Sequence, residues 1–122
     1  MKWFFLGSLS AFLSVAFGAF GAHALKEKIS PHFLEIFQTG VHYQMFHSLA
    51  LLFLGLFTIQ KNIHLNASGW FFFCGIILFS GSLYILSLTG IRSFGMITPF
   101  GGVCFLLGWM ILIVKVWKIW KT

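Results

Sequence analysis

Long apolar stretches separated by short polar segments make up most of the chain. Four of them have the length of a membrane helix, which needs about 20 mostly apolar residues; they cover residues 3–25, 41–60, 67–88 and 99–117. Apolar and polar positions do not alternate along these stretches, which disfavours strands. In lipid, only helices and closed barrels satisfy the hydrogen-bonding groups of the backbone. Four segments are too few to close a barrel, so the segments are expected to be helices. The pattern therefore predicts a single all-α membrane domain, a four-helix bundle.

Two short motifs predict where helices begin. Ser30 followed by Pro31 combines a side chain that caps backbone N–H groups with a residue suited to the first helical turn. The apolar residues that follow share one helical face, so we expect a short amphipathic interfacial helix between the first two spans. It either runs straight into the second span or bends at Gly40. Thr98 followed by Pro99 predicts a second cap, at the start of the fourth span.

The composition agrees with a membrane protein. Hydrophobic residues make up 59% of the chain and charged residues 8%, against about 25% charged in soluble domains. These values exclude an ordinary soluble domain, a disordered chain and a disulfide scaffold. The net charge is +6, but the basic residues are scattered at the ends of the spans and form no stripe. We therefore expect contact with the lipid bilayer and none with nucleic acid.

The distribution of basic residues predicts the orientation. An even number of spans places both termini on one side of the membrane. That side carries Lys2, Lys61, Lys115, Lys118 and Lys121, and the other side carries Lys26, Lys28 and Arg92. Four tryptophans also fall at the terminal side, as in an aromatic belt. Because basic residues are enriched on the cytoplasmic side, we predict cytoplasmic termini in a bacterial cytoplasmic membrane.

The first span also has features of a signal peptide, with Lys2 before the apolar run and an A-x-A pattern at residues 22–24. The run is longer than the usual apolar core of such a peptide. It also has a small residue at every fourth position, and this spacing lets two helices approach closely. We therefore expect a retained helix. The predicted helix-packing positions are Ser14, Gly18 and Ala22 in the first span and Gly101 and Gly108 in the fourth.

Polar and ionisable side chains gather in the half of the bundle opposite the termini. This candidate cluster comprises His23, His42, Gln44, His47, Tyr84, Arg92 and Thr98. Because such groups are costly at membrane depth, they are functional candidates. Since each lies at a similar depth on a different span, we expect His23, His47, Tyr84 and Thr98 to converge. Arg92 would cap the cluster from its loop by pairing with Glu35.

Four uses of this cluster are weighed against one another. The polar groups can bond one another between helices, hold a metal, hold a haem between His23 and a histidine of the second span, or line a path for protons or a small solute. His42 and His47 are five residues apart, about 140° around a helix, with no acidic ligand beside them, so we predict no metal site. A haem attachment motif is lacking, and we predict no cofactor. A path needs a lumen for which four short helices leave little room.

Features of enzymes and of disulfide bonds are weak. The chain contains no Asp, its two Glu lie in the segment between the first two spans, and no G-x-S-x-G motif occurs. We therefore predict no catalytic residues and no enzymatic activity. Cys74 and Cys104 fall near opposite ends of antiparallel spans three and four, which is too far apart for a bond. Two free thiols are expected.

An ordered set of motifs extends over nearly the whole chain. It comprises residues 18–25 (GAFGAHAL), 42–50 (HYQMFHSLA), 79–84 (FSGSLY), 89–90 (TG), 97–102 (ITPFGG) and 108–109 (GW). This set resembles the YgdD/YwdK-like family of small bacterial membrane proteins, which has vertebrate relatives. The resemblance implies a four-span membrane protein of unknown function and supplies no catalytic residue.

Two functions are therefore expected from the sequence. The first is a structural or interaction protein that packs with copies of itself or with a larger membrane complex. The second is a small transporter or channel component that uses the polar cluster. A wet cavity that reaches His47 would favour the second, and a dry interior with paired side chains would favour the first.

Overall fold

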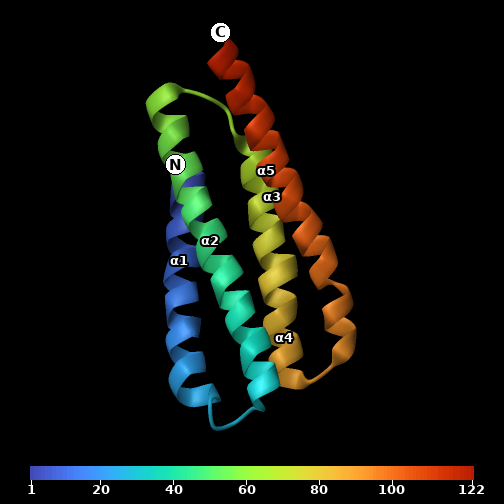
Figure 1. Ribbon diagram of the computed structural model, residues 1–122. Helices are drawn as coiled ribbons and strands as arrows, with labels where there is room; N and C mark the ends of the chain where they lie inside the picture. Colours follow the sequence, from blue (N-terminus) through green and yellow to red (C-terminus); the bar gives the residue numbers. More distant parts are fainter.

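The computed structural model describes residues 1–122 and is entirely helical (Figure 1). Helix α1 covers Lys2–Phe20 and continues through a π-helical turn, Gly21–Leu25; α2 covers Pro31–Lys61. Helix α3, Asn66–Gly75, continues through a second π-helical turn, Ile76–Ser80, into α4, Gly81–Thr89. A short 3-10 helix, Arg92–Met96, precedes α5, Thr98–Lys121. Four helical rods are thus long and apolar enough to cross a membrane, as the sequence predicted.

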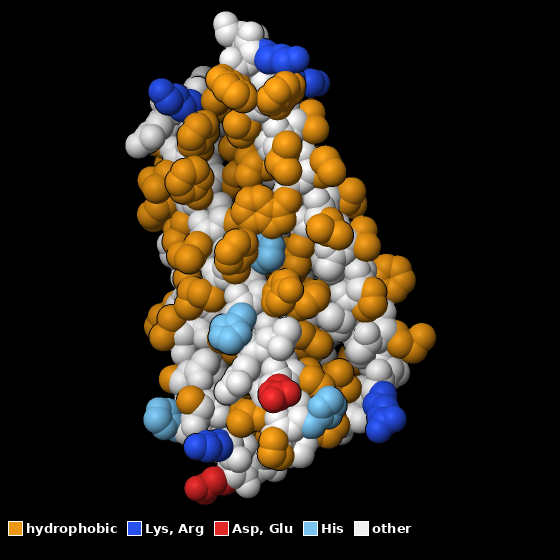
Figure 2. Space-filling model, viewed as in Figure 1, with side chains coloured by type: hydrophobic (Ala, Val, Ile, Leu, Met, Phe, Trp, Pro, Cys, Tyr) orange, Lys and Arg blue, Asp and Glu red, His pale blue; other side chains and the backbone are white.

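The four rods pack as a bundle. Helix α1 packs on α2, α2 packs on the rod formed by α3 and α4, and α5 packs on α3 and the π-helical turn that follows it. The two termini and the 62–65 connection lie at one end of the bundle, and the other two connections lie at the opposite end (Figure 1). On the face shown in Figure 2, hydrophobic side chains predominate between the two ends, and Lys and Arg lie near the ends. This is the surface that a lipid bilayer requires.

The predicted interfacial helix does not exist as a separate element. Ser30 caps the helix as expected, because its Oγ accepts a hydrogen bond from the Phe33 N–H at 3.3 Å. The helix then runs without a break from Pro31 to Lys61. Gly40 lies against the Tyr84 ring, where an added Cβ would come within 2.8 Å of a ring carbon. Gly40 therefore allows a close approach to α4 and does not end the helix, so the first turns of α2 belong to the bundle.

The apolar core lies in the half of the bundle that carries the termini. Its buried members are Trp3, Leu51, Leu54, Leu65, Phe72, Ile76 and Phe105. The Trp3 indole N–H donates to the Asn66 Oδ1 at 3.0 Å, and its ring lies over Gly69. This half is therefore held mainly by packing, although it also contains the buried Ser68, whose Oγ has no hydrogen-bond partner.

The predicted packing positions have different outcomes. Ser14, Gly101 and Gly108 are buried, and Gly101 lies so close to the Phe79 backbone that a Cβ would overlap it. Gly18 is half-buried beside Val41, but Ala22 is exposed, so its predicted role in packing is wrong. A strict four-residue spacing turns about 40° further around the helix at each step, because a full turn takes 3.6 residues. The buried face of the first rod instead follows Trp3, Gly7, Ser10, Ser14, Gly21 and Leu25.

Both cysteines are free thiols, as predicted. The reason given for that prediction was wrong. Gly75 lies against the Phe105 ring, so the neighbouring Cys74 and Cys104 lie at a similar level of the bundle. The error came from the level at which the fourth span begins: Thr98 lies beside Ser82, about two turns before α4 ends at Thr89, so Cys104 lies deeper in the bundle than expected.

Candidate functional site

A buried network of polar side chains joins α1, α2 and α4. Gln44 on α2 is 4% exposed. Its Nε2 donates to the Ser10 carbonyl at 3.1 Å and lies 3.3 Å from the Ser10 Oγ. Its Oε1 accepts from the Tyr84 hydroxyl at 2.5 Å. Both ends of this amide are therefore paired, and the amide bridges two neighbouring helices.

Serine hydroxyls extend the network. The Ser48 Oγ lies 2.7 Å from the Ser10 Oγ and 2.5 Å from the Gln44 carbonyl oxygen. The Ser80 Oγ donates to the Gly40 carbonyl at 2.7 Å. Small hydroxyl side chains on facing helices permit this close approach and hydrogen-bond across it. The network therefore bonds three of the bundle's helical segments together.

His47 forms a second centre, nearer the middle of the bundle. It is 3% exposed and stacks on the Phe105 ring, with centroids 3.6 Å apart and an interplanar angle of 7°. Its Nδ1 lies 2.8 Å from the Tyr43 carbonyl oxygen, which can only accept. Its Nε2 lies 3.0 Å from the Trp109 indole nitrogen, which can only donate. The ring is therefore the neutral tautomer with the proton on Nδ1, and both nitrogens are used within the protein.

Thr98 joins neither centre. Its Oγ1 lies 2.6 Å from the Ser82 Oγ, so it links the start of α5 to α4. The predicted helix cap at Thr98 is displaced by one residue, because Ile97 occupies the cap and Thr98 is the first helical residue. Its hydroxyl is therefore free to bond across to the neighbouring helix.

Three predicted members of the cluster lie outside these centres. His23, His42 and Arg92 are all exposed. The expected convergence of His23 with His47 is wrong, because the side chain of His23 lies outside the interior of the bundle. Glu35 is exposed as well, and Arg92 forms no ion pair with it. These residues were expected to meet because they lie at a similar depth. The rotation of each helix about its axis instead turns their side chains away from one another.

Four members of the two centres were not predicted from the sequence: Ser10, Ser48, Ser80 and Trp109. A serine in an apolar run resembles a neutral packing residue, so its role is visible only when a partner faces it. Trp109 had a stronger signal, since it lies within an apolar span while the other four tryptophans fall near the end of the bundle that carries the termini.

The donor set favours hydrogen bonding over metal binding. No three His, Cys, Asp or Glu side chains are grouped so that they could hold a metal ion. The buried groups are instead amides, hydroxyls and one neutral imidazole, and each of those described above has a partner. This arrangement can hold helices together in a solvent that offers no hydrogen bonds.

Comparison with known proteins identifies the family. A family model described as protein of unknown function (DUF423) matches residues 17–102. The chain belongs to the DUF423 family. It is 51% identical over 113 residues to a UPF0382 membrane protein of Staphylococcus aureus, with 93% of each chain covered. It is also 48% identical over 114 residues to a UPF0382 membrane protein of Staphylococcus saprophyticus, covering 93% of this chain and 95% of the relative.

These matches confirm the family resemblance and the membrane assignment. DUF423 members are small uncharacterised membrane proteins, and this chain is a multi-pass membrane protein with four transmembrane helices. No solved structure matches the chain significantly.

Proposed function

We propose that this DUF423 protein is a structural or interaction protein of the bacterial cytoplasmic membrane, without enzymatic activity. The observation that carries this proposal is that the buried polar groups of the two centres are paired within the protein; Ser68, near the termini, is the one buried side chain without a hydrogen-bond partner. Gln44 uses both ends of its amide, and His47 uses both ring nitrogens. Groups that serve a passing proton or solute need a free donor or acceptor. Paired groups serve instead to hold helices in one arrangement.

The setting of His47 supports this role further. Phe72, Phe105 and Trp109 all pack against its ring. A ring clamped by aromatic side chains and two hydrogen bonds is positioned as a link between α2 and α5. Tyr43 also contacts Phe105, and Phe46 contacts Trp109, so the His47–Trp109 hydrogen bond adds a polar link to an aromatic contact between these two helices.

Helix α5 supports the interaction part of the proposal. It packs on α3 and the following π-helical turn. Only 17% of the apolar stretch within Arg92–Lys121 is buried inside the protein. Phe100, Leu106 and Met110 are each more than half exposed. This face is available to further copies of the chain or to a larger membrane complex. Cross-linking in native membranes followed by partner identification would show which of these is bound.

The orientation is part of the same proposal. Both termini lie at the end of the bundle that carries five of the eight basic residues. Lys2 lies 4.9 Å from the centroid of the Trp3 ring, and Lys121 lies 4.9 Å from that of Trp117. Lysines beside tryptophans suit a membrane interface. This supports cytoplasmic termini.

The substitution His47→Leu tests the proposed role of the buried polar groups. It removes both hydrogen bonds of the ring and leaves the Trp109 N–H unpaired, so we expect a lower melting temperature in detergent. His32→Leu is the matched control, because His32 is an exposed histidine on the same helix. An unchanged melting temperature for His47→Leu would contradict the proposal and favour the alternative, a small transporter or channel component.

A further inference from the structure

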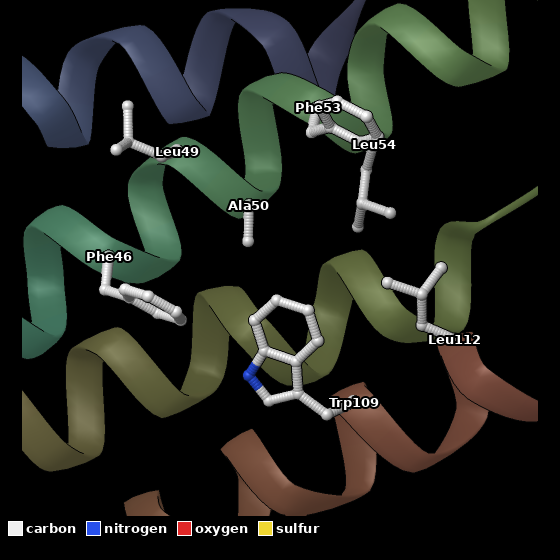
Figure 3. A pocket seen from close by; sticks show the side chains of 7 residues that line it. All are labelled: Phe46, Leu49, Ala50, Phe53, Leu54, Trp109 and Leu112. Atoms are coloured by element: carbon white, nitrogen blue, oxygen red, sulfur yellow. The ribbon is translucent and has the colours of Figure 1, made fainter.

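The groove between α2 and α5 cannot distinguish one phospholipid from another (Figure 3). It is a hollow of about 260 Å³ that is lined entirely by apolar residues. The indole N–H of Trp109, the one polar side-chain group of this lining, already donates to His47. Phospholipids with the same acyl chains and different headgroups pack equally well against such a surface. A preference for one class of lipid therefore requires charged or polar groups at the level of the headgroups.

The charged side chains at the two ends of the bundle differ. The end that carries the termini has five lysines and neither Asp nor Glu: Lys2, Lys61, Lys115, Lys118 and Lys121. The opposite end has three basic and two acidic side chains: Lys26, Lys28, Arg92, Glu27 and Glu35. The side chains thus contribute a formal charge of +5 at the first end and +1 at the second, which together make the net charge of +6. The first end therefore attracts an anionic partner.

Two unpaired hydrogen-bond donors lie together at this end, where α1 meets α3. The Lys2 Nζ lies 4.9 Å from the centroid of the Trp3 ring and 5.2 Å from that of Trp70, as in cation–π contacts. The two indoles pack edge to face with centroids 5.1 Å apart, and the Trp3 N–H is fixed by its bond to the Asn66 Oδ1. The Lys2 ammonium and the Trp70 indole N–H form no hydrogen bond within the protein, and Trp70 is 49% exposed. Both donors are therefore free for a ligand outside the bundle.

The other lysines of this end are placed differently. The Lys115 Nζ donates to the His64 carbonyl oxygen, so it links α5 to the 62–65 connection. Lys121 lies beside one indole, that of Trp117, and both residues belong to α5. Lys2 is held between indoles of two different helices. The Lys2–Trp70 pair is thus the best defined of these positions, while the remaining lysines add positive charge around it.

We propose that the end of the bundle that carries the termini binds the headgroup of an anionic phospholipid such as phosphatidylglycerol. The Lys2 ammonium and the Trp70 indole N–H donate to oxygens of its phosphodiester, and the indole rings lie beside the first carbons of its acyl chains. A zwitterionic phospholipid has the same phosphate but also a cationic amine, which the five lysines repel. The preference for an anionic headgroup therefore comes from the charge of this end, and the position of the headgroup comes from Lys2 and Trp70.

Native mass spectrometry of the protein with its bound lipids tests this proposal. The protein in detergent is equilibrated with equal amounts of phosphatidylglycerol and phosphatidylcholine that have the same acyl chains, and the number of each lipid retained per protein is measured. Wild type should retain phosphatidylglycerol in excess. Lys2→Gln should lower this excess about fivefold. Lys28→Gln, which removes the same charge from an exposed position at the opposite end, should leave it unchanged.

A second pair of variants tests the indole donor. Trp70→Phe keeps an aromatic ring and removes the N–H, so it should lower the excess several-fold. Trp120→Phe is the matched control, because Trp120 is also exposed and lies on α5. Equal retention of the two lipids by wild type would overturn the proposal and leave the charged end to an acidic protein partner. Equal effects of Lys2→Gln and Lys28→Gln would also overturn it, since net charge alone would then explain the preference. Melting temperatures in detergent establish that each variant is folded.

Discussion

The hydroxyl of Tyr84 offers a direct measure of the buried network. The substitution Tyr84→Phe removes one oxygen and keeps the ring, which packs on Phe17, Phe37 and Gly40. The lost bond is the one donated to the Gln44 Oε1 at 2.5 Å. The effect of this change therefore isolates a single hydrogen bond between α4 and α2.

The expected magnitude follows from the burial of Gln44, which is 4% exposed. Its amide oxygen loses the Tyr84 hydroxyl and has no water to replace it. Hydrogen bonds between membrane helices average about 0.6 kcal/mol and reach about 1.7 kcal/mol. An unpaired buried acceptor costs about 1–3 kcal/mol. We expect Tyr84→Phe to lower the free energy of unfolding by about 1–2 kcal/mol, within the range set by these two values.

The assay is reversible unfolding in mixed detergent micelles with increasing dodecyl sulfate, followed by circular dichroism. Tyr43→Phe is a matched control, because the chain has only two tyrosines and the Tyr43 hydroxyl forms no hydrogen bond in the structure. Its free energy of unfolding should change by less than about 0.5 kcal/mol. In a Gln44→Leu background, Tyr84→Phe should cost less than in wild type, since the acceptor is gone. Equal costs of the two tyrosine substitutions would refute the reasoning.

Three further predictions concern packing, orientation and the thiols. Gly101→Ala should destabilise the bundle by about 1–3 kcal/mol, because its Cβ overlaps a neighbouring backbone. Gly81→Ala, where nothing lies within 4 Å of the new Cβ, should be neutral or stabilising by up to about 1 kcal/mol in the same unfolding assay. A reporter fused after Lys121 should report a cytoplasmic C-terminus, and a periplasmic signal would reverse the proposed orientation. Thiol titration of the unfolded protein without reductant should find both Cys74 and Cys104 free, and a count below two would indicate a disulfide.

Local properties of the sequence determined the number of spans and the start of α2. Span length depends on the bilayer thickness, and helix starts depend on adjacent residues such as Ser30 and Pro31. Both signals can be read from a short window, so the all-α bundle was predictable. Whether a separate helix ends at Gly40 could not be predicted, because a glycine serves either a bend or a close contact between helices. The Tyr84 ring, 44 positions away in the chain, decides between them.

The tertiary structure decided which polar residues meet. Gln44 pairs with residues 34 and 40 positions away, and His47 pairs with Trp109, 62 positions away. In a soluble helix, the apolar stripe would show which side faces inward. In these spans apolar residues cover every side, because lipid replaces water outside, so the sequence holds little information on helix rotation. That rotation depends on small residues at close contacts and on the π-helical turns, and it buried His47 while leaving His23 and His42 at the surface.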